Sequence, residues 1–213
     1  MFVVPFGVTE CSLLEDLDDK LLLCCFFFSP SDYCELTADT NTVNSNLRLS
    51  ENNRTMTWVD QKQPYPDHPE RFNHWKQTLC STGLTGRSYW ETEWEGWVYV
   101  GVTYRGIKRA GASRDCWFGW NDHSWSLRCS DEGYFFWHNN KRTDISSSSS
   151  TSSSTSVSHR VAVYLDHPAG TLSFYRVSSD TLIHLHTFST TFTEPLYACF
   201  RLFTKSSVVL CSL

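Results

Sequence analysis

From Tyr33 onward, short aromatic and apolar runs recur about every ten residues, and turn-forming residues separate them. The clearest case is the pair Val161–Leu165 and Thr171–Val177, which flanks the loop Asp166–Gly170. That loop contains a proline and a glycine, and loops of this composition reverse the chain between antiparallel strands. The pattern predicts an all-β protein whose strands are joined mainly by hairpins.

Alternation between Tyr89 and Val102 predicts how these strands are buried. Apolar or β-branched residues fall on one face of the run and acidic residues on the other: Trp90, Thr92 and Trp94 against Glu91, Glu93 and Glu95. Aromatic residues make up 15% of the chain and include nine Trp, and such large side chains suit the space between two packed sheets. The fold class that we predict is therefore all-β, a two-sheet antiparallel β-sandwich.

Other runs predict further strands and one helical turn. Ser124–Cys129 and Tyr134–His138 flank a turn at Ser130–Gly133 and predict a second hairpin. Three runs near the C-terminus complete the expected strands: Leu182–Phe188, Leu196–Phe203 and Val208–Leu213. Apolar residues spaced three and four apart favour a helical turn within residues 69–79: Phe72, Trp75 and Leu79.

Residues 1–31 differ from the rest in composition. The apolar run Leu21–Phe28 shows neither strand alternation nor a helical stripe, and it follows acidic residues where a secretory signal requires positive ones. Nearly all residues of 21–31 can be encoded by pyrimidines, so one hypothesis is a translated polypyrimidine tract that precedes a splice acceptor. The alternative is an apolar segment that packs on the sandwich. With either origin, we expect low order before residue 32.

Residues 146–156 form an uninterrupted tract of Ser and Thr between two predicted strands. A polar tract of this kind has no apolar surface to bury and cannot offset the entropy of ordering its backbone. We therefore predict that it forms an expanded, disordered loop.

Charge and cysteine content argue against several classes of protein. The formal net charge is −5, so no broad basic surface is expected to attract nucleic acid or an anionic membrane. No run approaches the ~20 apolar residues of a membrane-spanning helix. The nine Cys are odd in number and include no C-x-x-C pair or zinc-ligand spacing. We expect reduced, mostly buried thiols in a cytoplasmic protein; the alternative is an oxidised, secreted form.

Two groups of polar residues could carry chemistry, and a structural role is the preferred interpretation of both. Glu91, Glu93 and Glu95 would project about 7 Å apart, a spacing that overlaps that of glycosidase carboxylates. Strand alternation alone produces this array, so we expect the Glu residues to pair with Arg or backbone donors. His184 and His186 do not complete a zinc site, and an exposed face of an edge strand is expected instead. We predict no catalytic residue, no metal and no cofactor.

Several segments, in order along the chain, carry a resemblance to one family. Residues 36–42 are similar to the opening of a PRY segment, although Ala-Asp-Thr stands where Leu-Asp-Pro is usual. Tyr89–Glu93 resembles the Trp-Glu-Val-Glu signature that follows it, with Thr92 in place of Val. Trp117–Trp125 resembles the central SPRY segment, and Tyr164–Tyr175 resembles the Leu-Asp-Tyr-Glu hairpin.

The chain thus resembles the PRY–SPRY family over residues 33–213, with a PRY segment at 32–85 and a SPRY segment at 86–213. The resemblance implies a concanavalin-like jelly roll of two sheets whose loops bind a protein or peptide ligand. It also implies a role in substrate capture for ubiquitination or in innate immune sensing, with no enzyme activity in the domain itself. Alternatives are a secreted component similar to fish pore-forming toxins, or a sugar-binding or sugar-hydrolysing sandwich.

Seven residues at predicted strand ends and loops are the candidate partner-binding residues: Tyr104, Arg105, Trp120, Asn121, Arg128, Asp131 and Phe203. They include the aromatic and Arg types that dominate interface energies. We expect Trp117 and Trp125 to lie in the core instead. We also expect no nucleic acid partner, no membrane span, and a monomer when the domain is isolated.

Overall fold

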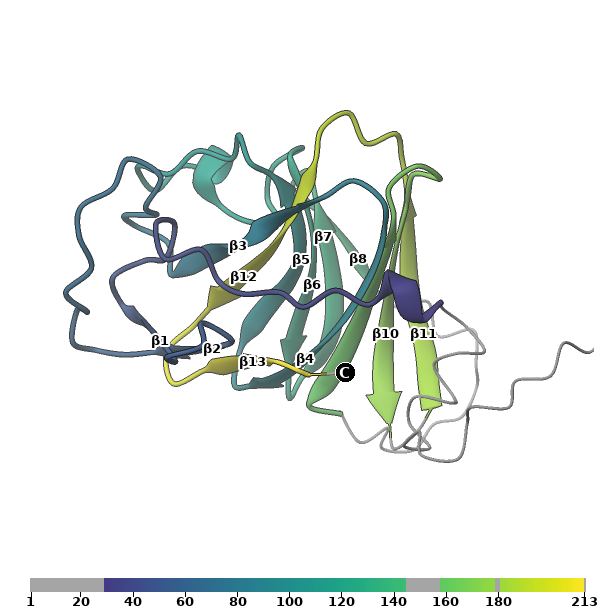
Figure 1. Ribbon diagram of the computed structural model, residues 1–213, viewed down its shortest axis with the longest axis horizontal. Helices are drawn as coiled ribbons and strands as arrows, with labels where there is room; N and C mark the ends of the chain where they lie inside the picture. The colour runs from purple at the N-terminus through teal and green to yellow at the C-terminus, as the bar shows by residue number, and fades with distance from the viewer. Residues whose placement is uncertain (1–28, 145–157, 179–180, 213) are drawn as a thin grey trace, which may run out of the picture.

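The computed structural model describes residues 29–144, 158–178 and 181–212 (Figure 1). Its regular structure consists of strands and two 3-10 turns, η1 (Pro30–Asp32) and η2 (Arg114–Cys116). The strands are β1 (Leu47–Leu49), β2 (Thr55–Trp58), β3 (Gln77–Leu84), β4 (Arg87–Glu95), β5 (Val98–Tyr104), β6 (Ser124–Ser130), β7 (Gly133–His138), β8 (Lys141–Asp144), β9 (Arg160–Asp166), β10 (Thr171–Ser178), β11 (Thr181–Ser189), β12 (Leu196–Leu202) and β13 (Ser207–Leu210). Of the segment 1–31, for which low order is predicted, residues 29–31 are described and lead into η1. Residues 1–28 and the tract 146–156 lie outside the described residues.

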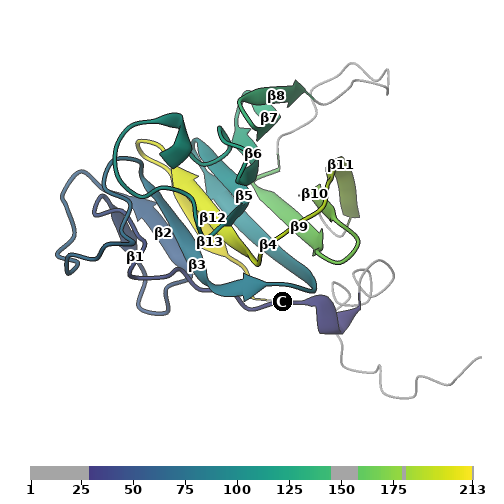
Figure 2. The same ribbon diagram turned by 90° about the horizontal axis from the view of Figure 1, so that it is seen from above.

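The strands form two antiparallel sheets that pack face to face, as Figures 1 and 2 show from perpendicular directions. One sheet has the order β1-β2-β13-β4-β9-β10-β11, and the other has the order β3-β12-β5-β6-β7-β8. The prediction of an all-β, two-sheet antiparallel sandwich is confirmed. Both predicted hairpins are present as β6–β7 and β9–β10.

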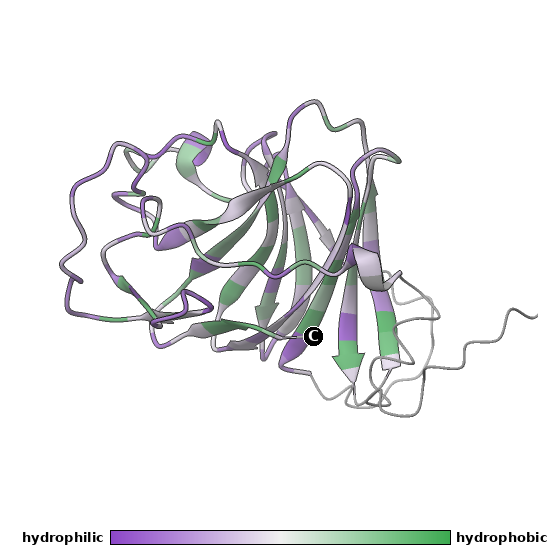
Figure 3. Ribbon diagram, in the orientation of Figure 1, coloured by the Kyte–Doolittle hydropathy of each residue, from purple (hydrophilic) through white to green (hydrophobic). Residues whose placement is uncertain are grey.

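The core lies between the sheets and is filled by the inward faces that strand alternation predicts. Apolar and polar positions alternate along the strands in Figure 3. Trp90 and Trp94 of β4 are 2% and 3% exposed. Buried side chains of this size each contribute about 1.5–3 kcal/mol through apolar surface removed from water. Trp125 is buried as expected, whereas Trp117 is only half-buried and lies outside this core.

Gly96 is the point at which the chain leaves one sheet for the other. β4 belongs to the seven-stranded sheet and β5 to the six-stranded sheet. Gly96 has a φ of +73°, and a Cβ there would lie 3.0 Å from Lys205 O. Glycine accepts this conformation without strain, so the alternating run from Tyr89 to Val102 becomes two strands in different layers.

The predicted helical turn within residues 69–79 is wrong, and this stretch is irregular up to the start of β3 at Gln77. The backbone of Phe72 bonds to distant residues and not to a local turn. Its N–H donates to Thr42 O, and its carbonyl accepts from Asn44 Nδ2. Phe72 and Leu79 are buried together on the outer face of the six-stranded sheet, so tertiary contacts replace helical ones.

The segment Tyr33–Asp39 links the two sheets. Cys34 N donates to Tyr89 O of β4, and Asp39 N donates to Leu79 O of β3. This segment crosses the front of the sandwich in Figure 1. Residues from the first half of the chain are therefore built into the same core as the strands of the second half.

Candidate recognition surface

The outward face of the six-stranded sheet carries a row of aromatic and Arg side chains. Paired positions across the sheet form a single line: Gln77, Arg201, Tyr99, Arg128, Phe135 and Asp144. Neighbouring residues in these strands, such as Val100, Leu127 and Phe136, point the other way into the core. Because side chains alternate along a strand, the residues of this row share the face that points away from the core.

Arg128 connects three parts of this face. Its guanidinium lies 4.3 Å from the ring centre of Trp97 and 5.3 Å from that of Phe135. Its Nη2 donates to Glu132 Oε2 over 2.7 Å across the β6–β7 turn. Trp97 is 42% exposed, a large fraction for such a side chain. An Arg stacked between rings keeps its side chain ordered and leaves the rings available to another molecule.

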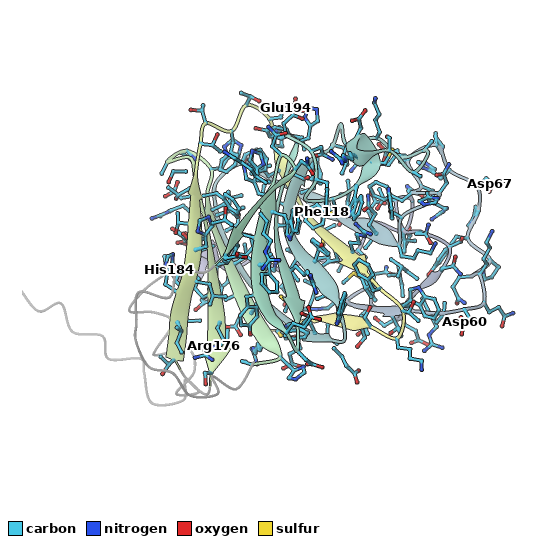
Figure 4. All side chains as sticks on the ribbon, turned by 180° about the vertical axis from the view of Figure 1, so that it is seen from behind. Asp60, Asp67, Phe118, Arg176, His184 and Glu194 are labelled. Carbon is cyan, nitrogen blue, oxygen red and sulfur yellow. The ribbon has the colours of Figure 1, made fainter. Side chains whose placement is uncertain are left out.

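A stack of four indole rings extends the face toward the segment that contains η2. Ring centres are 4.6 Å apart for Trp75 and Trp117, 4.3 Å for Trp117 and Trp120, and 4.5 Å for Trp120 and Trp137. All four side chains are half-buried. The stack borders Phe118, which is buried beneath it on the sheet and is labelled in Figure 4.

Phe203 and Arg201 complete the set of contacting side chains on this face. The ring centre of Phe203 lies 6.1 Å from that of Trp97 and 6.0 Å from that of Tyr99. The guanidinium of Arg201 lies 4.3 Å from the ring of Trp117 and 4.7 Å from that of Phe203. We name this continuous set the aromatic–arginine surface: Trp75, Trp97, Trp117, Trp120, Arg128, Phe135, Trp137, Arg201 and Phe203.

Three of the seven residues predicted from sequence lie in this surface: Trp120, Arg128 and Phe203. Tyr104 lies in the core, where its ring meets Trp125 and its hydroxyl accepts from Thr193 N. Asp131 is exposed in the β6–β7 turn. Arg105 lies apart from the surface and is held by ion pairs with Glu70 and Asp39.

Asn121 is buried and shapes the loop that carries Trp117 and Trp120. Its Nδ2 donates to the carbonyl of Trp117 over 3.0 Å, and its Oδ1 accepts from Ser124 Oγ over 2.8 Å. These bonds fix the loop onto the start of β6. Asn121 therefore positions the indole stack from within, and the surface is formed by its neighbours.

Sequence reasoning did not select six members of the surface: Trp75, Trp97, Trp117, Phe135, Trp137 and Arg201. Alternation offers a signal for some of them. Phe135 and Trp137 alternate with the buried Tyr134 and Phe136 along β7. Arg201 interrupts a strand that is otherwise apolar, Leu196–Leu202. A cation within such a strand marks a position that needs an explanation.

Arg160 pairs with two of the three Glu residues of strand β4. Glu91 is 4% exposed, accepts from Tyr89 Oη over 2.7 Å, and forms an ion pair with Arg160. Glu93 lies 3.5 Å from the same guanidinium. Burial lowers the pKa of Arg160, but Glu91, Cys211 and Glu93 together outweigh this and the pKa is raised. The prediction that these Glu residues pair with Arg is confirmed for Glu91 and Glu93.

The two His residues of β11 have different surroundings. β11 is the edge strand of its sheet, as predicted. His184 is exposed and its Nε2 lies 2.8 Å from Thr187 Oγ1. His186 is half-buried, with its ring centre 4.5 Å from that of Phe136, because a bulge opposite Phe174 and Tyr175 shifts the register between them. No cluster suited to a metal ion occurs within the described residues.

The thiols in the described part of the chain are unpaired and mostly buried. Cys80, Cys116, Cys129 and Cys199 are buried, whereas Cys34 and Cys211 are half-buried. Burial raises the pKa of Cys34 to about 11, and a backbone hydrogen bond with Tyr89 only partly offsets this. Thiols held in the protonated form are weak nucleophiles. Among the described residues, no helix has the length and apolar character needed to cross a bilayer.

Comparisons with known proteins cover most of the chain. Residues 36–84 match the family model of the SPRY-associated domain, PRY, and residues 87–212 match that of the SPRY domain. The chain is 45% identical to stonustoxin subunit beta of Synanceia horrida, over 78% of this chain and 23% of that protein. It is 36% identical to tripartite motif-containing protein 16 of Mus musculus, over 83% of this chain and 31% of that protein. It therefore spans less than a third of either relative.

Two solved structures have the same fold. A stonustoxin structure superposes with a TM-score of 0.73 and 42% identity, over 84% of this chain and 27% of that one. The crystal structure of the TRIM65 PSpry domain superposes with a TM-score of 0.74 and 24% identity, over 99% of this chain and 100% of that one. The second likeness concerns the fold alone.

Proposed function

The chain belongs to the PRY–SPRY family, and on that premise we propose that it is a non-catalytic module that recognises a protein or peptide partner through the aromatic–arginine surface. The observation that carries the proposal is the unbroken contact between half-exposed rings and Arg side chains on one sheet face. Trp and Arg are the residue types most often found at energetic hot spots of interfaces. A cluster of this composition on the outside of a sandwich is unusual unless it is covered by another molecule.

The way in which the rings are held supports recognition by a preformed surface. Phe135 and Trp137 lie on β7, Arg128 lies on β6, and Trp97 lies directly before β5. Trp117 and Trp120 lie on a loop that Asn121 fixes internally. Side chains that are already ordered lose little entropy when they bind, so more of the contact energy appears as affinity.

The finer role depends on parts of the protein beyond this domain. Substrate capture for ubiquitination, or sensing in innate immunity, is our first candidate, because a tripartite-motif relative shares the domain. A component of a secreted toxin is the second candidate, favoured by the 45% identity with stonustoxin subunit beta. A full-length transcript distinguishes them, because it shows whether the domain stands in a tripartite-motif protein or in a toxin subunit. Localisation to the cytoplasm belongs to the first candidate.

The surface can be tested with two matched variants, Trp97→Ala and Ile183→Ala. Both replace exposed large apolar side chains, at 42% and 36% exposure, but Ile183 lies on the other sheet. A photoreactive phenylalanine analogue at position 97 or 183 would first identify the partner by crosslinking. The purified partner would then be titrated calorimetrically against the full chain.

We expect crosslinking from position 97 and not from position 183. Trp97→Ala should weaken binding roughly 30-fold, which corresponds to about 2 kcal/mol for a hot-spot Trp. Ile183→Ala should change the affinity less than about twofold. Equal losses in the two variants, or a loss confined to Ile183→Ala, would show that the partner binds elsewhere.

A further inference from the structure

Arg201 is a buried cation that lacks an anionic partner within the described residues. The residue is 4% exposed, and its Nη1 is buried without a hydrogen-bond acceptor. No described carboxylate forms an ion pair with it. Two other Arg side chains that are largely withdrawn from water have such partners, Glu91 for Arg160 and Glu132 for Arg128. Arg109, which is half-buried and has no described carboxylate as partner, donates instead to the carbonyls of Ile107 and Arg105.

Aromatic rings surround the Arg201 guanidinium. Its central carbon lies 4.4 Å from the ring centre of Trp75, 4.3 Å from that of Trp117 and 4.7 Å from that of Phe203. Tyr99 adds a fourth ring at 5.5 Å. Ring faces attract a cation but provide no oxygen atoms to accept its N–H groups. The group is thus held in place while its buried Nη1 has no acceptor.

The surroundings increase the demand for an anion. Burial lowers the pKa of Arg201 to about 9, which reflects how strongly the site disfavours an uncompensated charge. The group still carries its charge near neutral pH. Removing a cation from water without a counter-ion is costly, and a paired anion in the same low-dielectric site offsets that cost.

Two of the walls are suited to move aside. Trp75 lies in the irregular stretch before β3, and Phe203 lies in the turn after β12. Both side chains are half-buried, whereas Tyr99 on β5 is fully packed. A side chain from another molecule could therefore reach the guanidinium by displacing the edge of one of these rings without disturbing the sheet.

We propose that Arg201 is the anchor point for a carboxylate of the bound partner, which enters between Trp75, Trp117 and Phe203. This deepens the proposed function and rests on it. The planar guanidinium fork matches the two oxygens of a carboxylate, and one carboxylate balances the single positive charge. A phosphate would carry a surplus of negative charge into the same aromatic enclosure. The partner motif is accordingly an Asp, a Glu or a chain terminus next to apolar residues.

The test uses the full chain labelled with ¹⁵N and follows the indole N–H signals of Trp75 and Trp117 by NMR. The probe is N-acetyl-aspartate amide, and its uncharged counterpart N-acetyl-asparagine amide is the control at equal ionic strength. A third titration uses inorganic phosphate. The protein variants are Arg201→Met, Arg201→Lys and Arg142→Gln. Arg142 is a matched Arg that also lies over a ring, that of Phe135, but is already paired with Asp144.

We expect the aspartate probe to shift both indole signals with a dissociation constant of roughly 1–10 mM, a normal value for so small a ligand. The asparagine probe should not do so. Arg201→Met should abolish the saturable shift, Arg142→Gln should retain it, and Arg201→Lys should weaken it at least about threefold because the fork is lost. If Arg201→Met does not fold, Arg201→Lys decides the question.

The proposal is overturned if the aspartate probe gives no shift, if the shift persists in Arg201→Met, or if phosphate gives the larger Arg201-dependent response. Each of these outcomes concerns the small probe alone. The test of the recognition surface with Trp97→Ala uses the whole partner, so failure of one experiment does not imply failure of the other.

Discussion

The ion pair between Glu91 and Arg160 allows a quantitative test of how β4 and β9 are joined on the outer side of the seven-stranded sheet. The Glu91 side chain is 4% exposed and that of Arg160 is 18% exposed. Arg160→Met would leave the carboxylate buried with the Tyr89 hydroxyl as its remaining side-chain donor. Removing one member of a buried pair costs about 3–5 kcal/mol, because the other charge stays uncompensated. Since Arg160 keeps some contact with water, we expect the free energy of unfolding to fall by about 3 kcal/mol, the lower limit of that range.

Urea denaturation followed by tryptophan fluorescence measures this loss. With a slope near 2 kcal/mol/M for a domain of this size, the midpoint should fall by about 1.5 M. The double variant Glu91→Leu/Arg160→Met should be less destabilised than Arg160→Met alone, because no buried charge remains. Glu93→Gln is the control: Glu93 is exposed, and its loss should cost less than about 0.5 kcal/mol.

A buried pair of this kind should couple the two positions by about 2 kcal/mol in the double-mutant cycle. Additivity of the two single changes within about 0.5 kcal/mol would refute it. That result would mean that water or a rearranged side chain compensates each charge when its partner is removed, so that neither residue needs the other.

Two further predictions concern stability. Gly101→Ala should destabilise the domain by about 3 kcal/mol or more, because the added Cβ would lie 2.1 Å from Trp125 O between paired strands. In the control Gly106→Ala, the added Cβ meets no atom within 4 Å, so the stability should change by less than about 0.5 kcal/mol. Equal effects of the two changes in urea melts would contradict the packing argument. Burial, together with His184, lowers the pKa of His186, so protonation below about pH 6.5 favours the unfolded chain and the free energy of unfolding should decline between about pH 7 and pH 5. His186→Gln should show a smaller decline in the same urea melts. An unchanged pH dependence in this variant would count against His186 as the group responsible.

Strand positions and their buried faces follow from the sequence because they are local properties. The alternation from Tyr89 to Glu95 is enough to place Trp90 and Trp94 inside. The same local information misleads at residues 69–79, where apolar spacing suggests a helical turn. There the backbone of Phe72 bonds to Thr42 and Asn44, more than 25 residues away in sequence. Nothing within a short window reveals such partners.

The aromatic–arginine surface was predictable only in part, for a related reason. Trp120, Arg128 and Phe203 have the residue types of an interface, and each lies in or next to a turn. Tyr104 shares both properties but lies in the core, because the chain after β11 brings Thr193 onto its hydroxyl. Arg201 depends on rings at positions 75, 99, 117 and 203 that converge only when the six-stranded sheet and its loops are assembled. Its surroundings are a property of the tertiary fold.

The linking segment Tyr33–Asp39 and strand β3 tie the PRY segment of this domain to its SPRY segment. β3 is the outermost strand of its sheet and pairs with β12, and β13 pairs with β2. A gene rearrangement that broke the chain between residues 84 and 87, where the two family models meet, would expose the unpaired edges of β12 and β13 to aggregation. We therefore expect the two segments to fold as one unit and neither to fold well without the other.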